Sequence, residues 1–127
     1  MKLLDTTVAV DHLRGDPAAV DLLRGLVEDD EILAASEVIR FELVAGVQDD
    51  ELPALEQFFS ALSWVSVGGD VARTAGELAR EYRRANSGID DADYLIAATA
   101  LLLEAELLTT NVGRFPMLPD IRPPYQD

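Results

Sequence analysis

The stretch MKLLDTTVAV, residues 1–10, contains a short apolar strand that ends at a carboxylate. Leu3 and Leu4 are typical of a buried strand over residues 2–5, and Asp5 is its last residue. An acid at this position has two explanations. It can cap the next helix, or it can be one part of a chemical site whose other parts lie far along the chain.

Beyond this strand, apolar runs alternate with helical patterns. Further strands are predicted over residues 32–36, 63–67 and 106–111, with helices that begin at Pro17, Glu37 and Leu52, run from Val71 towards Gly88, and follow the acids at 90–93. Residues 119–124 can supply only a short edge strand, because their prolines cannot join a central ladder. The alternation indicates one α/β domain over residues 1–127, with a mainly parallel sheet and helices on both faces.

The composition limits where the protein can act and how it can bind a metal. Of its 127 residues, 49% are hydrophobic, which is enough for one core of ordinary size. The longest apolar run, residues 94–103, is too short to cross a bilayer, and the N-terminus lacks the features of a signal peptide. We therefore expect a cytoplasmic protein with no membrane association. Cysteine is absent, so a metal must be bound by oxygen atoms or by His12.

The chain is strongly acidic, with a formal net charge of -14 from 24 acids and 10 bases. On average such a chain repels phosphate backbones. A bound divalent cation would reverse the sign of the charge locally, and nine of the ten bases are arginine, which can bind phosphate with two parallel hydrogen bonds. The net charge therefore does not exclude nucleic acid as a partner.

Two acids lie on apolar helix faces instead of on the solvent side. Glu42 follows the apolar stripe of its helix, and Asp93 belongs to the most hydrophobic helix of the chain. Each also has a structural explanation. Glu42 can pair with an arginine at the boundary of the core, and Asp93 can be a first-turn acid next to a capping residue, Asp90 or Asp91.

Asp5, Glu42 and Asp93 would meet near the carboxyl ends of parallel strands, where ligands bind in such sheets. Two unit charges about 4 Å apart repel by roughly 4 kcal/mol at an effective dielectric of about 20, so the three acids need a compensating cation. Oxygen donors favour Mg2+, with Mn2+ as a substitute, and a metal-bound water can attack a phosphodiester. Hydroxyls that could orient the carboxylates or the water come from Thr6, Thr7 and Ser36, of which Ser36 can equally cap the helix that begins at Glu37.

Four motifs carry a family resemblance. In order they are LLDTTV (3–8), FELVAG (41–46), DADYLIAATA (91–100) and LLTTNVGRF (107–115), and together they resemble the PIN-domain ribonucleases of the VapC toxin type. The resemblance implies a three-layer PIN-like α/β domain with a central, mainly parallel sheet flanked by helices. It also implies an Mg2+-dependent endoribonuclease that acts on RNA, forms a dimer and is neutralised by a cognate VapB-type antitoxin.

The resemblance assigns the family's three acids to Asp5, Glu42 and Asp93. Many family members have a fourth acid after the late strand, where this chain has Asn111. An amide can bind a metal-bound water but adds no negative charge, so we expect one tightly bound Mg2+ and a second that binds, if at all, with the RNA. Asn111 keeps one alternative open, a PIN-like binding module with weak or no catalysis. A second alternative is a PIN nuclease that is not a toxin, which the absence of a neighbouring antitoxin gene would favour.

Arginines are the candidates for RNA contacts. We consider Arg14, Arg40, Arg83 and Arg84, each of which can instead pair with one of the many surface acids. An arginine-rich antitoxin tail suits an acidic groove better than RNA does.

Overall fold

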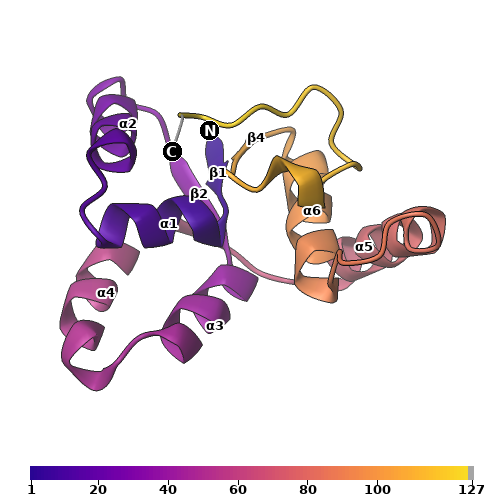
Figure 1. The fold of residues 1–127 in the computed structure, drawn as a ribbon, viewed down its shortest axis with the longest axis horizontal. Helices are drawn as coiled ribbons and strands as arrows, with labels where there is room; N and C mark the ends of the chain where they lie inside the picture. Colours follow the sequence, from indigo (N-terminus) through magenta and orange to yellow (C-terminus); the bar gives the residue numbers. More distant parts are fainter. Residues whose placement is uncertain (126–127) are drawn as a thin grey trace.

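The computed structural model describes residues 1–125, and its centre is a four-stranded sheet (Figure 1). The strands are β1 (Lys2–Leu4), β2 (Leu33–Ser36), β3 (Ser63–Val65) and β4 (Glu106–Leu108). Their order is β3-β2-β1-β4, and every pairing between neighbours is parallel. The first strand of the chain is therefore central, between the second and the last.

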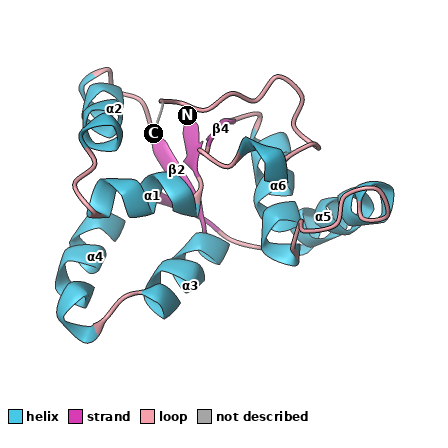
Figure 2. Cartoon of the chain, viewed as in Figure 1, coloured by secondary structure: helices cyan, strands magenta, loops and turns pink. Residues whose placement is uncertain are grey.

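Helices cover both faces of this sheet. One side carries α1 (Thr6–Leu13), α2 (Pro17–Glu28), α3 (Glu37–Gly46) and α4 (Leu52–Phe59), and the other carries α5 (Gly69–Tyr82) and α6 (Asp91–Leu103) (Figure 2). Two short 3-10 turns, η1 (Asp49–Glu51) and η2 (Val112–Arg114), connect these elements. The predicted three-layer α/β architecture is confirmed, with a sheet that is entirely parallel within residues 1–125. No helix in this part of the chain has the length and apolarity needed to cross a membrane.

The core forms where the strands meet the apolar helix faces. Leu3 and Leu4 of β1 and Ala34 of β2 are fully buried, as a central parallel strand requires when helices cover both faces. In α6, residues 96–100 are buried without interruption, because this helix lies between the sheet and α5. The middle of this helix therefore belongs to the core, whereas Leu101, Leu102 and Leu103 in its last turn are exposed.

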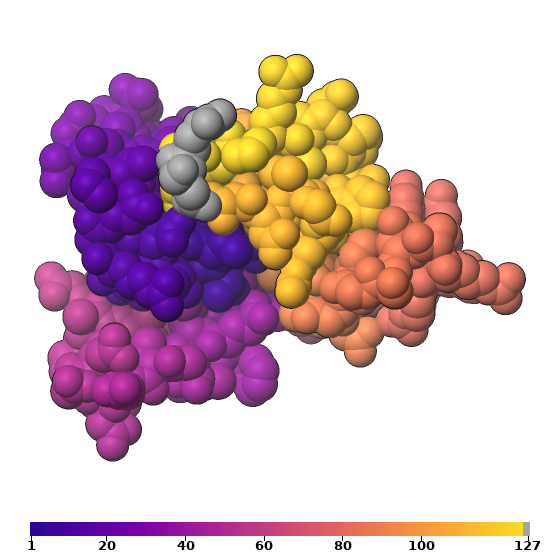
Figure 3. Space-filling view, in the orientation of Figure 1, coloured from indigo at the N-terminus to yellow at the C-terminus, as the bar shows by residue number. Residues whose placement is uncertain are grey.

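The parallel arrangement brings the carboxyl ends of all four strands to the same edge of the sheet. Leu4 pairs with Leu108, and the backbone N–H of Asp5 donates to the Leu108 carbonyl at 3.0 Å, so the residues after β1 and β4 are neighbours. In the space-filling view, the N-terminal part of the chain (indigo) lies beside the C-terminal part (orange to yellow) (Figure 3). The carboxyl edge therefore collects side chains that are more than 100 positions apart, such as those of Asp5 and Thr109.

Several predicted boundaries were wrong. The helix α1 was not predicted, and it begins immediately after Asp5. Strands β3 and β4 end before the predicted limits at 67 and 111. Residues 119–124 contain no strand, because the three prolines at 119, 123 and 124 remove the N–H donors that an edge strand would use.

Candidate active site

Asp5 is buried at the carboxyl end of β1, with 6% of its surface exposed. Asp5 occupies the N-cap position of α1, but its side chain makes no capping hydrogen bond. Instead the Oδ2 atom accepts a hydrogen bond from the Thr109 hydroxyl at 2.6 Å and a longer one from the Thr7 hydroxyl at 3.5 Å. Burial raises the pKa of Asp5, and these hydrogen bonds offset part of that increase. The capping explanation for this carboxylate is therefore wrong.

A network of hydroxyls connects this carboxylate to the residues after β4. Thr109 is fully buried, and its Oγ1 accepts a hydrogen bond from the backbone N–H of Asn111 at 3.0 Å. Thr7 Oγ1 lies 3.3 Å from Thr109 Oγ1 and accepts from the N–H of Thr110 at 3.1 Å. Sequence reasoning did not single out Thr109. The available indication was its position directly after an apolar strand, within the TTN motif.

Glu42 reaches the same edge from α3. It is half-buried, and its Oε1 accepts a hydrogen bond from the Thr6 hydroxyl at 2.8 Å. Burial raises the pKa of Glu42, and the negative charges of Asp5 and Asp90 raise it further. Glu42 makes no ion pair with an arginine within residues 1–125, so the explanation as a boundary ion pair is wrong for this part of the chain.

Asp93 lies in the first turn of α6 and is also 6% exposed. It forms a capping box with Asp90, in which each side chain accepts a hydrogen bond at 3.1 Å from the other residue's backbone N–H. The structural explanation for Asp93 therefore holds, and the predicted cap is Asp90. Burial and the nearby negative charge of Asp90 raise the pKa of Asp93 to about 6, despite the backbone hydrogen bond that favours its ionised form.

Arg114 is the cation closest to these acids among residues 1–125. Its Nη1 lies 3.6 Å from the Oδ2 of Asp93 and 3.6 Å from the Oδ2 of Asp90. Its positive charge lowers the pKa of Asp5, Glu42 and Asp93, in each case against a larger increase from burial. One arginine therefore acts electrostatically on three acids from three different elements.

The donors at this edge fit a divalent cation that keeps part of its water shell. Within residues 1–125 no three acids are arranged as a ready-made chelate. Mg2+, however, is usually bound through one or two carboxylates together with several waters. Buried carboxylate oxygens with raised pKa values, and one arginine to compensate them, are a chemically suitable environment for such an ion.

The remaining predicted residues have different environments. Ser36 is buried and caps α3 by accepting a hydrogen bond from the Val38 N–H at 3.1 Å, so the predicted cap is confirmed. Asn111 is exposed and precedes η2. Arg14 lines a hollow of about 160 Å³ next to Thr6 and Glu42.

The other three predicted arginines lie outside the acid cluster. Arg40 binds Glu37 and stacks on Trp64, with its guanidinium carbon 3.9 Å from the ring centroid, so it supports α3 against β3. Arg83 donates to Asp91 at 2.7 Å. Together with Arg84, Arg83 lines a hollow of about 800 Å³ along α5.

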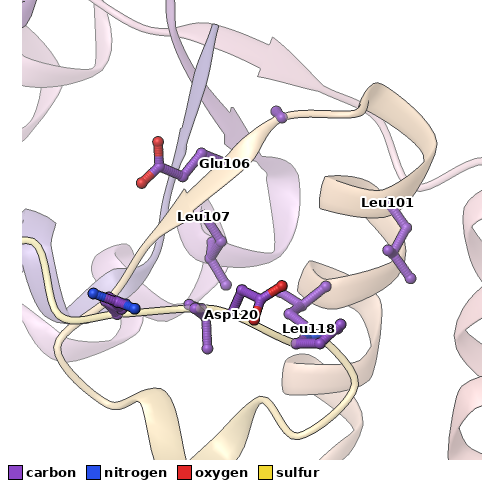
Figure 4. Close-up of a pocket in the computed structure, with 9 residues that line it drawn as sticks. Leu101, Glu106, Leu107, Leu118 and Asp120 are labelled. Atoms are coloured by element: carbon purple, nitrogen blue, oxygen red, sulfur yellow. The ribbon is translucent and has the colours of Figure 1, made fainter.

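A further hollow, of about 440 Å³, lies at the start of β4 (Figure 4). Leu101, Leu107 and Leu118 line it from α6, β4 and the C-terminal segment, and Glu106 pairs with Lys2. Asp5, Glu42, Asp90 and Asp93 are not among the residues that line this hollow, so it is separate from the candidate site.

An all-parallel sheet between two helical layers, with acids from three elements near its carboxyl edge, defines a class of α/β domains whose sites form at strand ends. The chain belongs to the PIN-domain family, whose model matches residues 2–116. Ribonucleases with this domain are metal-dependent in general.

The comparison with individual proteins gives close relatives over nearly the whole length. The chain is 62% identical over 125 residues to Ribonuclease VapC19 of Mycobacterium tuberculosis, covering 98% of this chain and 100% of the relative. Its identity to Ribonuclease VapC10 of the same organism is 38%, with coverages of 98% and 93%. The solved structure of VapBC2 from Rickettsia felis bound to a promoter DNA fragment matches with a TM-score of 0.80 and 25% identity over 94% of each chain.

Proposed function

We propose that this chain is an endoribonuclease of the VapC type, the toxin of a toxin-antitoxin pair, which hydrolyses phosphodiester bonds in RNA with the help of Mg2+. Mn2+ would be a functional substitute. The observation that supports the proposal is that Asp5, Glu42 and Asp93 of a PIN domain each feel the charge of Arg114, while burial raises the pKa of all three. The 62% identity to a protein named as a ribonuclease supports RNA as the substrate.

In this proposal Asp5 and Asp93 hold the metal ion, and Glu42 completes the site or orients the attacking water. A divalent cation bound here supplies a water of lowered pKa and a positive charge for the phosphate oxygens. Thr6 and Thr109 hold the carboxylates of Glu42 and Asp5 in place through their hydroxyl donors. Thr7 connects the two ends of the network and Ser36 fixes the start of α3, while Asn111 would bind a water or a ribose hydroxyl through its amide.

The proposal includes the partners and the form of the protein. We expect a single PIN domain over residues 1–127 that forms a homodimer, acts in the cytoplasm and is neutralised by a VapB-type antitoxin. The antitoxin complexes among the solved structures that resemble this fold support that partner. Arg14, Arg83 and Arg84 line hollows on the surface and are the proposed contacts for the RNA backbone. Arg40 is left out because Glu37 and Trp64 already occupy its guanidinium.

One observation favours a second candidate function. Asp93 is engaged by both a capping box and Arg114, so the metal-free site resembles a stable structural cluster. A PIN-like module that binds RNA or protein without cleaving it would have this arrangement. Cleavage by the purified chain separates this candidate from the toxin nuclease and from a nuclease that is not a toxin.

The test compares Asp5→Asn and Asp93→Asn with the wild-type chain on single-stranded RNA, with Mg2+ and with EDTA. We expect the wild type to cleave only with metal, and each variant to be slower by about two orders of magnitude. Asp21→Asn is the matched control. It removes the same charge from an exposed position on α2, away from the site. Equal cleavage by all four chains would exclude the proposed site. Binding without cleavage by the wild type would favour the second candidate.

A further inference from the structure

Arg114 is held in a fixed position beside the acids. It ends the 3-10 turn η2, where its N–H donates to the Asn111 carbonyl at 3.2 Å. The next residue, Phe115, is 1% exposed and anchors the turn in the core. At the other end of the segment, the N–H of Asn111 is bound by Thr109. Both sides of Arg114 are therefore tied to the buried structure, and its position is fixed with respect to Asp93.

The guanidinium of Arg114 is only partly used. Both of its carboxylate contacts go through Nη1 at 3.6 Å, which is longer than a direct hydrogen bond. Within residues 1–125 no hydrogen bond is formed by its Nε or Nη2, and 47% of the side chain is exposed. The free N–H groups form a planar fork that matches the geometry of a phosphate.

The charge balance of the site requires such a group. Asp5, Glu42, Asp93 and Asp90 bring four negative charges when ionised, and a single Mg2+ neutralises two of them. An RNA phosphate would then approach a site that is still negative, at an energetic cost that is large at short range. Among the basic residues of 1–125, only Arg114 has a charged nitrogen within 4 Å of a carboxylate oxygen of Asp5, Glu42 or Asp93, and that oxygen belongs to Asp93. Arg83 is bound to Asp91 instead, at 2.7 Å.

We propose that Arg114 binds the phosphate that is cleaved and acts as the second cation of the site, so that one divalent metal ion per chain is sufficient. This inference rests on the proposed nuclease function. In the free protein the guanidinium compensates Asp93 and Asp90. With metal and RNA bound, its free N–H groups contact the non-bridging phosphate oxygens and stabilise the charge that develops on them.

The experiment measures metal binding and cleavage separately for the wild type, Arg114→Gln and Arg114→Lys. Titration calorimetry with Mn2+ on the RNA-free protein should give one ion per wild-type chain. Arg114→Gln should bind Mn2+ with the same stoichiometry and with equal or tighter affinity, because a neighbouring positive charge is removed. The single-turnover cleavage of RNA by Arg114→Gln should be slower by about 100-fold or more.

The cleavage rate of Arg114→Lys should lie between those of the wild type and Arg114→Gln, since lysine keeps the charge but loses the fork of N–H groups. Arg122→Gln, an exposed arginine away from the acids, is the matched control and should behave as the wild type in both measurements.

Three results would overturn the assignment of Arg114. The first is cleavage of RNA by Arg114→Gln at the wild-type rate. The second is loss of Mn2+ binding in Arg114→Gln, which would make Arg114 a support for Asp93. The third is the binding of two tight Mn2+ ions by the RNA-free wild type. Absence of cleavage by the wild type would instead contradict the proposed function, and this inference with it. The wild-type reaction therefore distinguishes the two failures.

Discussion

Asp5 shows how a single carboxylate can be placed for chemistry by the residues around it. Its position at the start of α1 would suit a helix cap, yet the side chain turns towards Thr109 on the neighbouring strand end. A capping carboxylate is stabilised by backbone N–H groups of its own helix. The Oδ2 atom of Asp5 accepts from the Thr109 and Thr7 hydroxyls instead, and the backbone N–H of Thr6 also favours its ionised form.

The Thr109 hydroxyl should therefore control the reactivity of Asp5. Thr109→Val keeps the shape but removes the donor at 2.6 Å and the acceptor for the Asn111 N–H. We expect a loss of about 1 to 3 kcal/mol in the free energy of unfolding. Metal affinity and RNA cleavage should fall by about 10- to 100-fold, because the ligand loses its orienting partner. Urea denaturation, Mn2+ titration and cleavage rates measure these effects.

Thr99→Val is the matched control for this change. Thr99 is equally buried, but its hydroxyl donates to the Leu95 carbonyl inside α6. This control should retain metal affinity and cleavage. If both variants behave alike at the active site, Thr109 is a packing residue and not a support for Asp5.

The first turn of α6 combines a structural and a chemical task. Asp90 and Asp93 satisfy each other's backbone N–H groups and so define where the helix begins. Asp93 is at the same time the proposed metal ligand. The position of the ligand thus depends on the integrity of the cap, and helix fraying would displace the carboxylate.

Changes at Asp90 separate capping from charge. Asp90→Asn removes the charge but keeps a good capping residue, whereas Asp90→Ala removes both. We expect Asp90→Ala to be less stable than Asp90→Asn by about 1 kcal/mol in urea denaturation. Its cleavage rate should also be lower, because Asp93 loses its fixed helix terminus. Equal stability of the two variants would show that the cap contributes nothing to α6.

Sequence patterns predicted the elements that depend on local signals. The apolar strands and the amphipathic α5 follow from hydrophobic periodicity, and the rule for parallel sheets correctly placed Asp5 and Ser36 at one edge. The helix α1 was missed because its sequence, TTVAVDHL, is rich in β-branched residues and is stabilised by packing on α2 and α3. The contacts of Thr109 and Arg114 depend on the register of β4 against β1, which no local pattern encodes.

The charge of the molecule and its proposed substrate can be reconciled through the site. A net charge of -14 repels RNA at long range, so binding must rely on short-range contacts and a bound cation. The same charge attracts a basic antitoxin segment. Arg114 at η2, beside Asp90 and Asp93, and Arg83 at the end of α5, paired with Asp91, would contact RNA and would be covered by an antitoxin.

Stability of the metal-free protein should fall as the pH rises through the titration of its site acids. The pKa of Asp93 in the folded state is about 6, which is above its value in the unfolded state. At pH values between these two pKa values, the folded state therefore binds more protons than the unfolded state. The contribution of protonated Asp93 to the free energy of unfolding is complete below about pH 4 and is lost as the pH rises through about 6. Asp93 contributes to this loss because its ionisation in the folded state leaves a charge that is partly buried and close to Asp90. The raised pKa values of Asp5 and Glu42 act in the same direction.

Urea denaturation in EDTA between about pH 4 and pH 8 measures this loss, and Asp93→Asn should remove most of the part due to Asp93. Added Mg2+ should restore stability at neutral pH, because it binds the ionised carboxylates of the folded state, and should have little effect below about pH 5, where protons compete. The comparison of wild type and Asp93→Asn cancels the contribution of the other acids of the chain. The contrary result is a free energy of unfolding that depends on pH in the same way for both proteins, with and without Mg2+. Asp93 would then be neither the titrating group nor a metal ligand, because both roles need its carboxylate.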